Sequence, residues 1–228
     1  MSSIDNINYV KITYKNQETD YPSKFCQHLA DKFKLKGYLL DIGCGDGRFT
    51  EAFAKCGLAV TGLDISETAR ERLGQNLVNW HLQGQPYPLP DASFDVIFSK
   101  SVVEHLIDPE ILIDQAYRLL KPGGVFICMT PSWKHSYKEA FYIDHTHVTP
   151  FTRHSLETIC ELSGFKAECN YFYQLPKLWK FPLLHIGRVI LNTFQLPYRP
   201  FFRVKWLDCI NKTIRFSKEA MLLCVARK

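Results

Sequence analysis

The sequence lacks the features of a membrane-spanning or secreted protein. It has no run of about 20 mostly apolar residues, the length that a helix needs to cross a bilayer. Its N-terminus includes Asp5 and other polar side chains in place of the apolar stretch of a signal peptide. Its eight cysteines form no C-x-x-C pair, which argues against a disulfide framework or a zinc site. We therefore expect a cytoplasmic protein with reduced thiols.

Repeats and low-complexity tracts are also missing, so the composition is that of a globular protein rather than a fibrous or disordered one. The 228 residues, 46% of them hydrophobic and 22% charged, suffice for one substantial core. The sequence thus predicts a single domain with at most one insertion.

Acidic residues are scarce in the segment 174–218, where Asp208 is the one acid among nine basic residues. The segment carries a net charge of +8, whereas the whole chain carries +5 and the remainder is therefore −3. One segment makes the protein basic, so its partner is a separate question from that of the remaining chain.

Short apolar runs alternate with amphipathic ones from Tyr38 onward, which is typical of βαβ units around a parallel sheet. We predict an α/β fold with a doubly wound, mostly parallel sheet and helices on both faces. Residues 9–14 are expected to form a further strand or a lid. The predicted strands cover 38–42, 58–63, 80–82, 94–99, 125–130, 165–173 and 219–227, and the predicted helices cover 23–33, 47–56, 66–77, 109–120 and 152–163.

Three glycines stand where the first predicted strand turns into a helix, at Gly43, Gly45 and Gly47. Without Cβ atoms, a backbone of this kind can adopt unusual dihedral angles and approach a ligand closely. The spacing is Gly-x-Gly-x-Gly, whereas a dinucleotide site prefers Gly-x-Gly-x-x-Gly. The turn therefore indicates a ligand other than NAD or FAD, or else a tight turn without a ligand.

Asp64 ends the second predicted strand, where a carboxylate can accept hydrogen bonds from both hydroxyls of a ribose. Alone, it could equally serve the start of the helix after Ser66. Together with the three glycines, it predicts a nucleoside site.

The segments 41–47, 63–64, 93–97, 103–106 and 118–124 resemble, in order, the motifs of class I S-adenosylmethionine-dependent methyltransferases of the small-molecule branch. The loop at 144–152 also resembles one in methyltransferases associated with polysaccharide, lipid or quinone biosynthesis, in which an Asp and a His precede a Pro-Phe-Thr turn. The resemblance covers roughly residues 37–173 and implies a Rossmann-like fold with seven strands and S-adenosyl-L-methionine as the methyl donor.

The resemblance also assigns the donor contacts by position. Asp41 would hold the amino-acid end of the donor, the glycine turn with Cys44 would pack against it, and Asp64 with Ile65 would bind the ribose. Gln83 and Gly84 stand where relatives carry an acid for the adenine amino group, and a Gln carbonyl can still accept from an amine. Ser99 would line the pocket near the methionine part. The predicted donor residues are Asp41, Gly43, Cys44, Gly45, Gly47, Asp64, Ile65, Gln83, Gly84 and Ser99.

With this assignment the chain divides into four parts. We expect an N-terminal helix or lid region at 1–36 and a donor-binding core at 37–173. A basic amphipathic insertion follows at 174–218, and 219–228 forms the last core strand.

Acceptor chemistry is expected in the segment 142–152, at the carboxyl edge of the sheet where open α/β folds bind substrates. The resemblance favours His147 as the base, with His145 as the alternative, and Asp144 is a carboxylate that could orient either. The segment could instead be a polar loop without catalytic groups. A metal site from these three residues lacks a further acid, so we expect no metal. His105 borders the active site or closes its helix.

Between 181 and 197 the polar residues of the basic insertion recur every three or four positions, which places them along one side of a helix whose other positions are apolar. Its apolar face, basic residues and aromatic side chains favour an anionic membrane surface or a cover over a lipid-like substrate. Packing on the domain or a dimer interface are the alternatives, and the oligomeric state stays open. Nucleic acid is disfavoured because 98–101 lacks the Asn/Asp-Pro-Pro-aromatic stretch of amino-group base methyltransferases.

We therefore predict an enzyme that methylates an oxygen of a sugar, lipid-linked or quinone-like small molecule, in the cytoplasm or at the inner face of a membrane. A different class of function would be a non-catalytic sensor or membrane scaffold that keeps the nucleoside pocket. An RNA methyltransferase and a nicotinamide oxidoreductase are less favoured.

Overall fold

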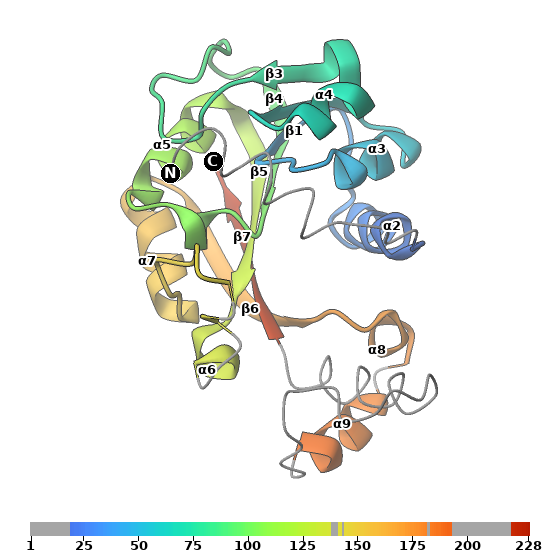
Figure 1. Cartoon of the computed structure of the whole chain (residues 1–228). Helices are drawn as coiled ribbons and strands as arrows, with labels where there is room; N and C mark the ends of the chain where they lie inside the picture. Colours follow the sequence, from blue (N-terminus) through green and yellow to red (C-terminus); the bar gives the residue numbers. More distant parts are fainter. Residues whose placement is uncertain (1–18, 138–140, 143, 182, 193–219) are drawn as a thin grey trace.

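A computed structural model describes residues 19–137, 141–142, 144–181, 183–192 and 220–228 (Figure 1). The described chain contains a sheet of seven strands in the order β3-β2-β1-β4-β5-β7-β6. The first five strands of the chain run parallel, whereas β7 pairs antiparallel with both β5 and β6. The strands are β1 (Tyr38–Ile42), β2 (Ala59–Asp64), β3 (Leu77–Asn79), β4 (Phe94–Lys100), β5 (Leu120–Pro131), β6 (Lys166–Tyr173) and β7 (Ala220–Arg227).

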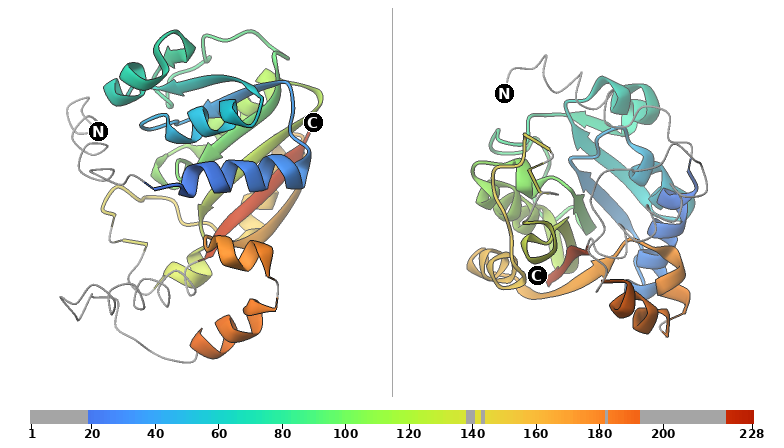
Figure 2. Two further views of the ribbon diagram at one scale, coloured as in Figure 1. Left: turned by 90° about the vertical axis from the view of Figure 1, so that its right-hand side faces the viewer. Right: turned by 60° about the horizontal axis from the view of Figure 1, so that its bottom comes forward.

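Helices cover both faces of this sheet, as predicted (Figures 1 and 2). These helices are α2 (Tyr21–Phe33), α3 (Arg48–Lys55), α4 (Glu67–Leu73), α5 (Pro109–Leu119) and α7 (Arg153–Leu162), whereas α9 (Leu184–Asn192) lies away from the sheet (Figure 1). Short turns of helix complete the described chain, namely η1 (Gly74–Asn76), η2 (Val103–His105), α6 (Trp133–Ser136) and α8 (Pro176–Lys180).

Two hydrophobic clusters pack against opposite faces of the sheet, because successive residues of a strand point to opposite sides. On one side, Phe98 of β4 packs with Phe25 of α2 and Phe53 of α3. On the other, Ile97 of β4 packs with Leu112 of α5. All five side chains are buried, and each contributes roughly 1.5–3 kcal/mol by its removal from water. Central strands therefore read as nearly continuous apolar runs.

The prediction was wrong for the end of one helix and for the position of the strand that follows it. The helix expected to reach residue 77 ends at Leu73, because Gly74 adopts a positive φ of 53° and turns the chain into η1. The third strand is then Leu77–Asn79 rather than 80–82, in parallel register with β2 through the pairs Gly62–Leu77 and Asp64–Asn79. Because Gly74 ends α4 early, β3 begins three residues before its predicted start.

The fifth strand also begins earlier than expected. Helix α5 ends at Leu119, one residue before its predicted end, and strand pairing already starts at Leu120, which lies opposite Phe94. The register then shifts between Phe94 and Val96, because the turn at Gly123 and Gly124 interrupts the pairing of β5 with β4. The turn is thus an irregularity within β5 rather than a loop before it.

The segment between β6 and β7 contains α8 and α9 among its described residues. The predicted helix over 181–197 is represented by α9, and its last residues lie outside the described part, as do 9–14 and all of 193–219. Within the residues described, we find no helix of the length and apolar character that a bilayer span requires.

Candidate active site

The glycine turn between β1 and α3 has the backbone that only glycine adopts easily. Gly43, Gly45 and Gly47 have φ values of +73°, +62° and +79°. A Cβ atom at Gly43 would lie 2.4 Å from Cγ2 of Val102, and one at Gly47 would lie 2.9 Å from Cγ of Leu73. The turn therefore needs glycine both for its dihedral angles and for its close packing.

Asp64 ties this turn to the end of β2. One carboxylate oxygen accepts the N–H of Gly45 at 2.8 Å, and the other accepts the N–H of Ser66 at 2.9 Å. Burial raises the pKa of Asp64, and the N–H groups of Gly45, Ser66 and Ile65 act against this rise. A carboxylate offers about four lone-pair sites, so the remaining ones can accept ribose hydroxyls.

Asp41 lies beneath the turn rather than at its surface. It is 2% exposed, and its Oδ2 accepts the hydroxyl of Thr50 in α3 at 2.5 Å. Burial raises the pKa of Asp41 to about 7, with a further contribution from the nearby Asp64. Its side chain thus supports the turn from below. Cys44 is also buried, and burial raises the pKa of its thiol, so the thiol stays protonated.

The predicted adenine end contains a polar group without a partner. Nε2 of Gln83 is buried and has no hydrogen bond within the described part of the chain. A Cβ at Gly84 would lie 3.0 Å from the carbonyl oxygen of His81 and 3.1 Å from Nε1 of Trp80. A buried amide without a partner is costly, so a ligand that hydrogen bonds to it would stabilise this site.

Ser99 presents a second such group at the carboxyl end of β4. It is 1% exposed, and its Oγ has no partner among the described residues. The parallel strands β1, β2 and β4 end at the same edge, so the turn, Asp64 and Ser99 share it. The site therefore offers a turn of three glycines, the remaining lone pairs of the Asp64 carboxylate, and two polar atoms without partners among the described residues. These groups fit a nucleoside with an amino-acid tail. The residues present thus suit S-adenosylmethionine.

His147 lies at the same edge, and its hydrogen bonding determines which ring nitrogen carries the proton. Nδ1 lies 2.7 Å from the carbonyl oxygen of Phe141, which can only accept, so Nδ1 carries the proton. Nε2 then keeps the lone pair that a general base needs. It lies 4.0 Å from Oε1 of Glu104 and 3.9 Å from Oδ2 of Asp144.

The other predicted groups divide between this cluster and the surface. Asp144 accepts the hydroxyl of Thr146 at 2.6 Å, and that hydroxyl lies 2.7 Å from Nδ1 of His105. Asp144 thus orients Thr146 as well as facing His147. His145 is exposed, which leaves it outside the cluster.

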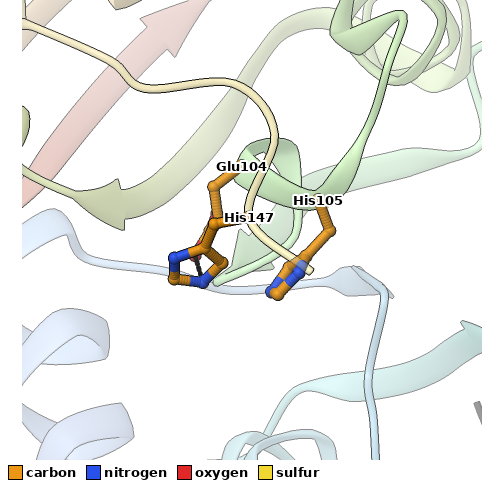
Figure 3. A group of neighbouring side chains, drawn as sticks. All are labelled: Glu104, His105 and His147. Carbon is orange, nitrogen blue, oxygen red and sulfur yellow. Dashed lines mark ion pairs between the residues drawn. The ribbon is translucent and has the colours of Figure 1, made fainter. Parts of the chain in front are cut away.

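Glu104 and His105 complete the site from η2, and the ring of His105 lies 4.6 Å from that of His147 (Figure 3). Burial raises the pKa of Glu104 to about 7, although Thr130 and Lys100 act to lower it. Burial and the neighbouring His147 lower the pKa of His105 to about 4, so this ring is neutral at pH 7. Glu104 was missed as a site residue, although the Glu-His pair was visible in the motif at 103–106.

The donor atoms of Glu104, His105 and His147 lie within 4.8 Å of one another and are of the types that bind divalent metals. This set differs from the one considered in the sequence, since Glu104 and His105 replace Asp144 and His145. Ligands about 2.1 Å from a tetrahedral ion stand about 3.4 Å apart. Nε2 of His147 and Oε1 of Glu104 are 4.0 Å apart, so the two atoms would have to move closer together to ligate one tetrahedral ion.

Aromatic side chains form a wall beside His147. The ring of Phe141 lies 4.6 Å from that of His147, and Trp133 packs against Phe141 at 5.4 Å and against Tyr142 at 6.1 Å. Tyr142 is 59% exposed, so the wall reaches solvent. Such a surface suits a planar or apolar acceptor next to the base.

Comparison with known proteins shows the family of the chain. A family model described as a methyltransferase domain matches residues 14–170. The ubiquinone biosynthesis O-methyltransferase of Coxiella burnetii is 38% identical over 106 residues, which are 43% of this chain and 45% of that protein. The chain thus matches about half the length of such relatives.

Solved structures share the fold. A SAM-dependent methyltransferase from Archaeoglobus fulgidus has a TM-score of 0.63 at 23% identity, over 90% of this chain and 94% of that one. A phosphoethanolamine N-methyltransferase of Haemonchus contortus, in complex with phosphomonomethylethanolamine and S-adenosylhomocysteine, has a TM-score of 0.60 at 21% identity, covering 98% and 60%. With the family model matched over most of its length, the chain belongs to the methyltransferase-domain family and is a class I S-adenosylmethionine-dependent methyltransferase.

Proposed function

We propose that this protein transfers the methyl group of S-adenosylmethionine to an oxygen atom of a small, quinone-like or phenolic acceptor. The position of His147 carries this proposal, because Nε2 keeps a lone pair at the sheet edge where the donor residues meet. An oxygen acceptor must lose a proton during the reaction, and a positioned base supplies about 10²–10⁴-fold of the rate.

The donor supplies an electrophilic methyl group on a positively charged sulfur. The glycine turn and Asp64 would hold the ribose side of the donor, and Gln83 and Ser99 would offer their unpartnered atoms to its adenine and methionine ends. His147 takes the acceptor proton on Nε2 as the oxygen–carbon bond forms and the carbon–sulfur bond breaks. The products are the methyl ether, S-adenosylhomocysteine and a protonated His147, which releases its proton to solvent.

The aromatic wall favours a quinone-like or phenolic acceptor over a sugar. Phe141 packs on the ring of His147, Trp133 and Tyr142 pack edge-on against Phe141 and against each other, and an aromatic pair is worth about 0.5–1.5 kcal/mol. The name of the C. burnetii relative, a ubiquinone biosynthesis O-methyltransferase, supports the same class.

We also propose that α8 and α9 bring the protein to an anionic membrane surface, where a lipid-like acceptor would be found. Leu183 is 81% exposed and Ile186 is 64% exposed, and neighbouring Lys177 and Lys180 are exposed as well. Apolar side chains flanked by cations are typical of helices that lie at a membrane interface. The excess of basic residues in 174–218 supports this attachment.

The acceptor class can be tested by offering donor with a labelled methyl group together with matched acceptors. We expect label in a catechol and in a long-chain phenol, and little in a hexose or an amine of similar size. Labelling of the amine at neutral pH with no labelling of either phenol would refute oxygen transfer.

A further inference from the structure

Glu104 is the most deeply buried charged group of the site. It is 0% exposed, and its Oε2 accepts the hydroxyl of Thr130 in β5 at 2.9 Å. Its Oε1 has no hydrogen-bond partner among the described residues and faces Nε2 of His147 at 4.0 Å. A buried carboxylate oxygen without a partner is costly, which indicates that a partner arrives during function.

The backbone of Glu104 holds the segment that carries His147. Its carbonyl oxygen accepts the N–H of Val148 at 2.8 Å and the N–H of Thr149 at 3.1 Å. The hydroxyl of Thr149 donates to the carbonyl oxygen of Leu106 at 2.8 Å. The residue after the base is thus fixed to η2, so Glu104 and His147 keep a defined relation.

We propose that Glu104 is the positioning residue of His147, a carboxylate that forms an ion pair with its imidazolium once the acceptor proton has arrived. The proposal rests on the proposed function, since it assigns to Glu104 a part in the same proton transfer. Before transfer, a lone pair on Nε2 faces a carboxylate, and the two atoms stay apart at 4.0 Å. After transfer, Nε2 carries N–H, and the same carboxylate attracts it.

The proton inventory of this step is simple. The acceptor O–H bond breaks, its proton moves to Nε2, and its electron pair forms the new bond to carbon. The positive charge lost at sulfur reappears on the imidazolium, between the carboxylates of Glu104 and Asp144. Opposite charges within about 4–6 Å stabilise each other, so the carboxylate of Glu104 would stabilise the imidazolium that the transfer creates.

The groups that face Glu104 come from several elements. Lys100 at the end of β4 favours its ionised form, whereas Asp144 in the His147 segment disfavours it. The buried thiol of Cys128 in β5 and the neutral ring of His105 also lie near Glu104. Lys100 and Asp144 thus act on the ionisation of Glu104 in opposite directions. Protonation of His147 then places a new positive charge next to Glu104.

The test is to titrate His147 in the full-length chain by imidazole ¹⁵N NMR, with His147→Asn to assign its signals. We expect Glu104→Gln to lower the pKa of His147 by about one unit or more relative to wild type. Glu161→Gln, a matched change at an exposed position on α7, should leave it unchanged. An equal pKa of His147 in wild type and Glu104→Gln would overturn the proposal, because a purely structural role would not move this titration.

Turnover of a simple catechol probe separates this result from the proposed function. Glu104→Gln should lose about tenfold or more in kcat with unchanged affinity for S-adenosylhomocysteine, and Glu104→Asp should recover part of the loss. A titration shift without methyl transfer by wild type to any oxygen acceptor would defeat the proposed function while the ion pair stands. Activity that requires added Mg²⁺ or Zn²⁺ in wild type, together with loss of metal binding in Glu104→Gln, would make Glu104 a ligand and overturn the ion pair.

Discussion

Gly45 has a φ of +62°, a conformation in which a branched side chain is strongly strained. We expect Gly45→Val to abolish binding of S-adenosylhomocysteine in isothermal titration calorimetry, because the turn would rearrange. Asp64→Ala should weaken binding by about 10–100-fold, since hydrogen bonds to a charged group contribute about 1.5–3 kcal/mol.

A matched control separates strain from ligand contact. Gly57 also has a positive φ, of +90°, but no atom lies within 4 Å of the Cβ that an alanine would add. Gly57→Ala should therefore cost stability and leave the affinity for S-adenosylhomocysteine unchanged. Wild-type affinity in both Gly45→Val and Asp64→Ala would show that the donor lies elsewhere.

Asp41 makes stability depend on pH. Its folded-state pKa of about 7 lies above the ordinary value of 3.8, so folding favours the protonated carboxyl. The contribution of Asp41 to stability is thus full below about pH 4 and is lost as the pH rises through about 7. Urea unfolding at pH 5 and pH 8 should show that Asp41→Asn removes part of the loss on going to pH 8.

Asp95 makes stability depend on pH in the opposite direction. Hydrogen bonds from the N–H of Tyr38 and from Lys121 hold the pKa of Asp95 below its usual value. Its contribution is present above the ordinary pKa and is lost in acid, so Asp95→Asn should reduce the loss of stability at low pH. If Asp41→Asn and Asp95→Asn changed the pH dependence of stability in the same way, the raised pKa of Asp41 would be contradicted.

At the scale of elements, α7 has a well-defined start. Thr152 and Ser155 form a capping box, in which the Thr152 hydroxyl accepts the N–H of Ser155 at 3.1 Å. We expect Thr152→Ala to lower the free energy of unfolding by about 1 kcal/mol, measured in urea. Ser66 precedes α4 without a side-chain bond to the helix backbone, so Ser66→Ala removes the contact with the Thr68 hydroxyl but no cap bond. A smaller cost for Thr152→Ala than for Ser66→Ala would contradict the cap.

Sequence reasoning found most elements because their physical signals are local. Thr152 and Gly164 mark the two ends of α7, and the strand at 38–42 has the predicted bounds. The early end of α4 was missed because Gly74 lies within a pattern that continues to favour helix. The start of β5 at Leu120 depends on pairing with Phe94, which no local window contains.

The site divides in the same way. The glycine turn and Asp64 were predictable because one strand-to-helix turn determines them. Glu104 was not singled out, since its contact with His147 joins η2 to a segment more than 40 residues later, and its burial follows from tertiary packing. The contacts of an active-site loop are long-range, and sequence spacing does not encode them.

At the scale of the whole molecule, the exposed apolar side chains of α9 and the basic segment 174–218 should act together. Wild type should sediment with anionic liposomes at low salt and less at high salt, because each cation near such a surface contributes about 1 kcal/mol. Ile186→Glu should weaken this binding. Leu162→Glu is the control, since Leu162 is 83% exposed on α7. Absence of sedimentation under every condition would remove the membrane proposal, and a dimer that Ile186→Glu dissociates would assign the surface to self-association.

The central claim is that His147 removes the proton of an oxygen acceptor. It is tested most directly by transfer of a labelled methyl group to a catechol, with wild type, His147→Ala and His145→Ala compared at saturating donor. We predict that His147→Ala keeps donor affinity and loses at least about 10²-fold in turnover, whereas the exposed His145 can be replaced with little loss. Turnover by His147→Ala equal to wild type, or loss confined to His145→Ala, would contradict the account.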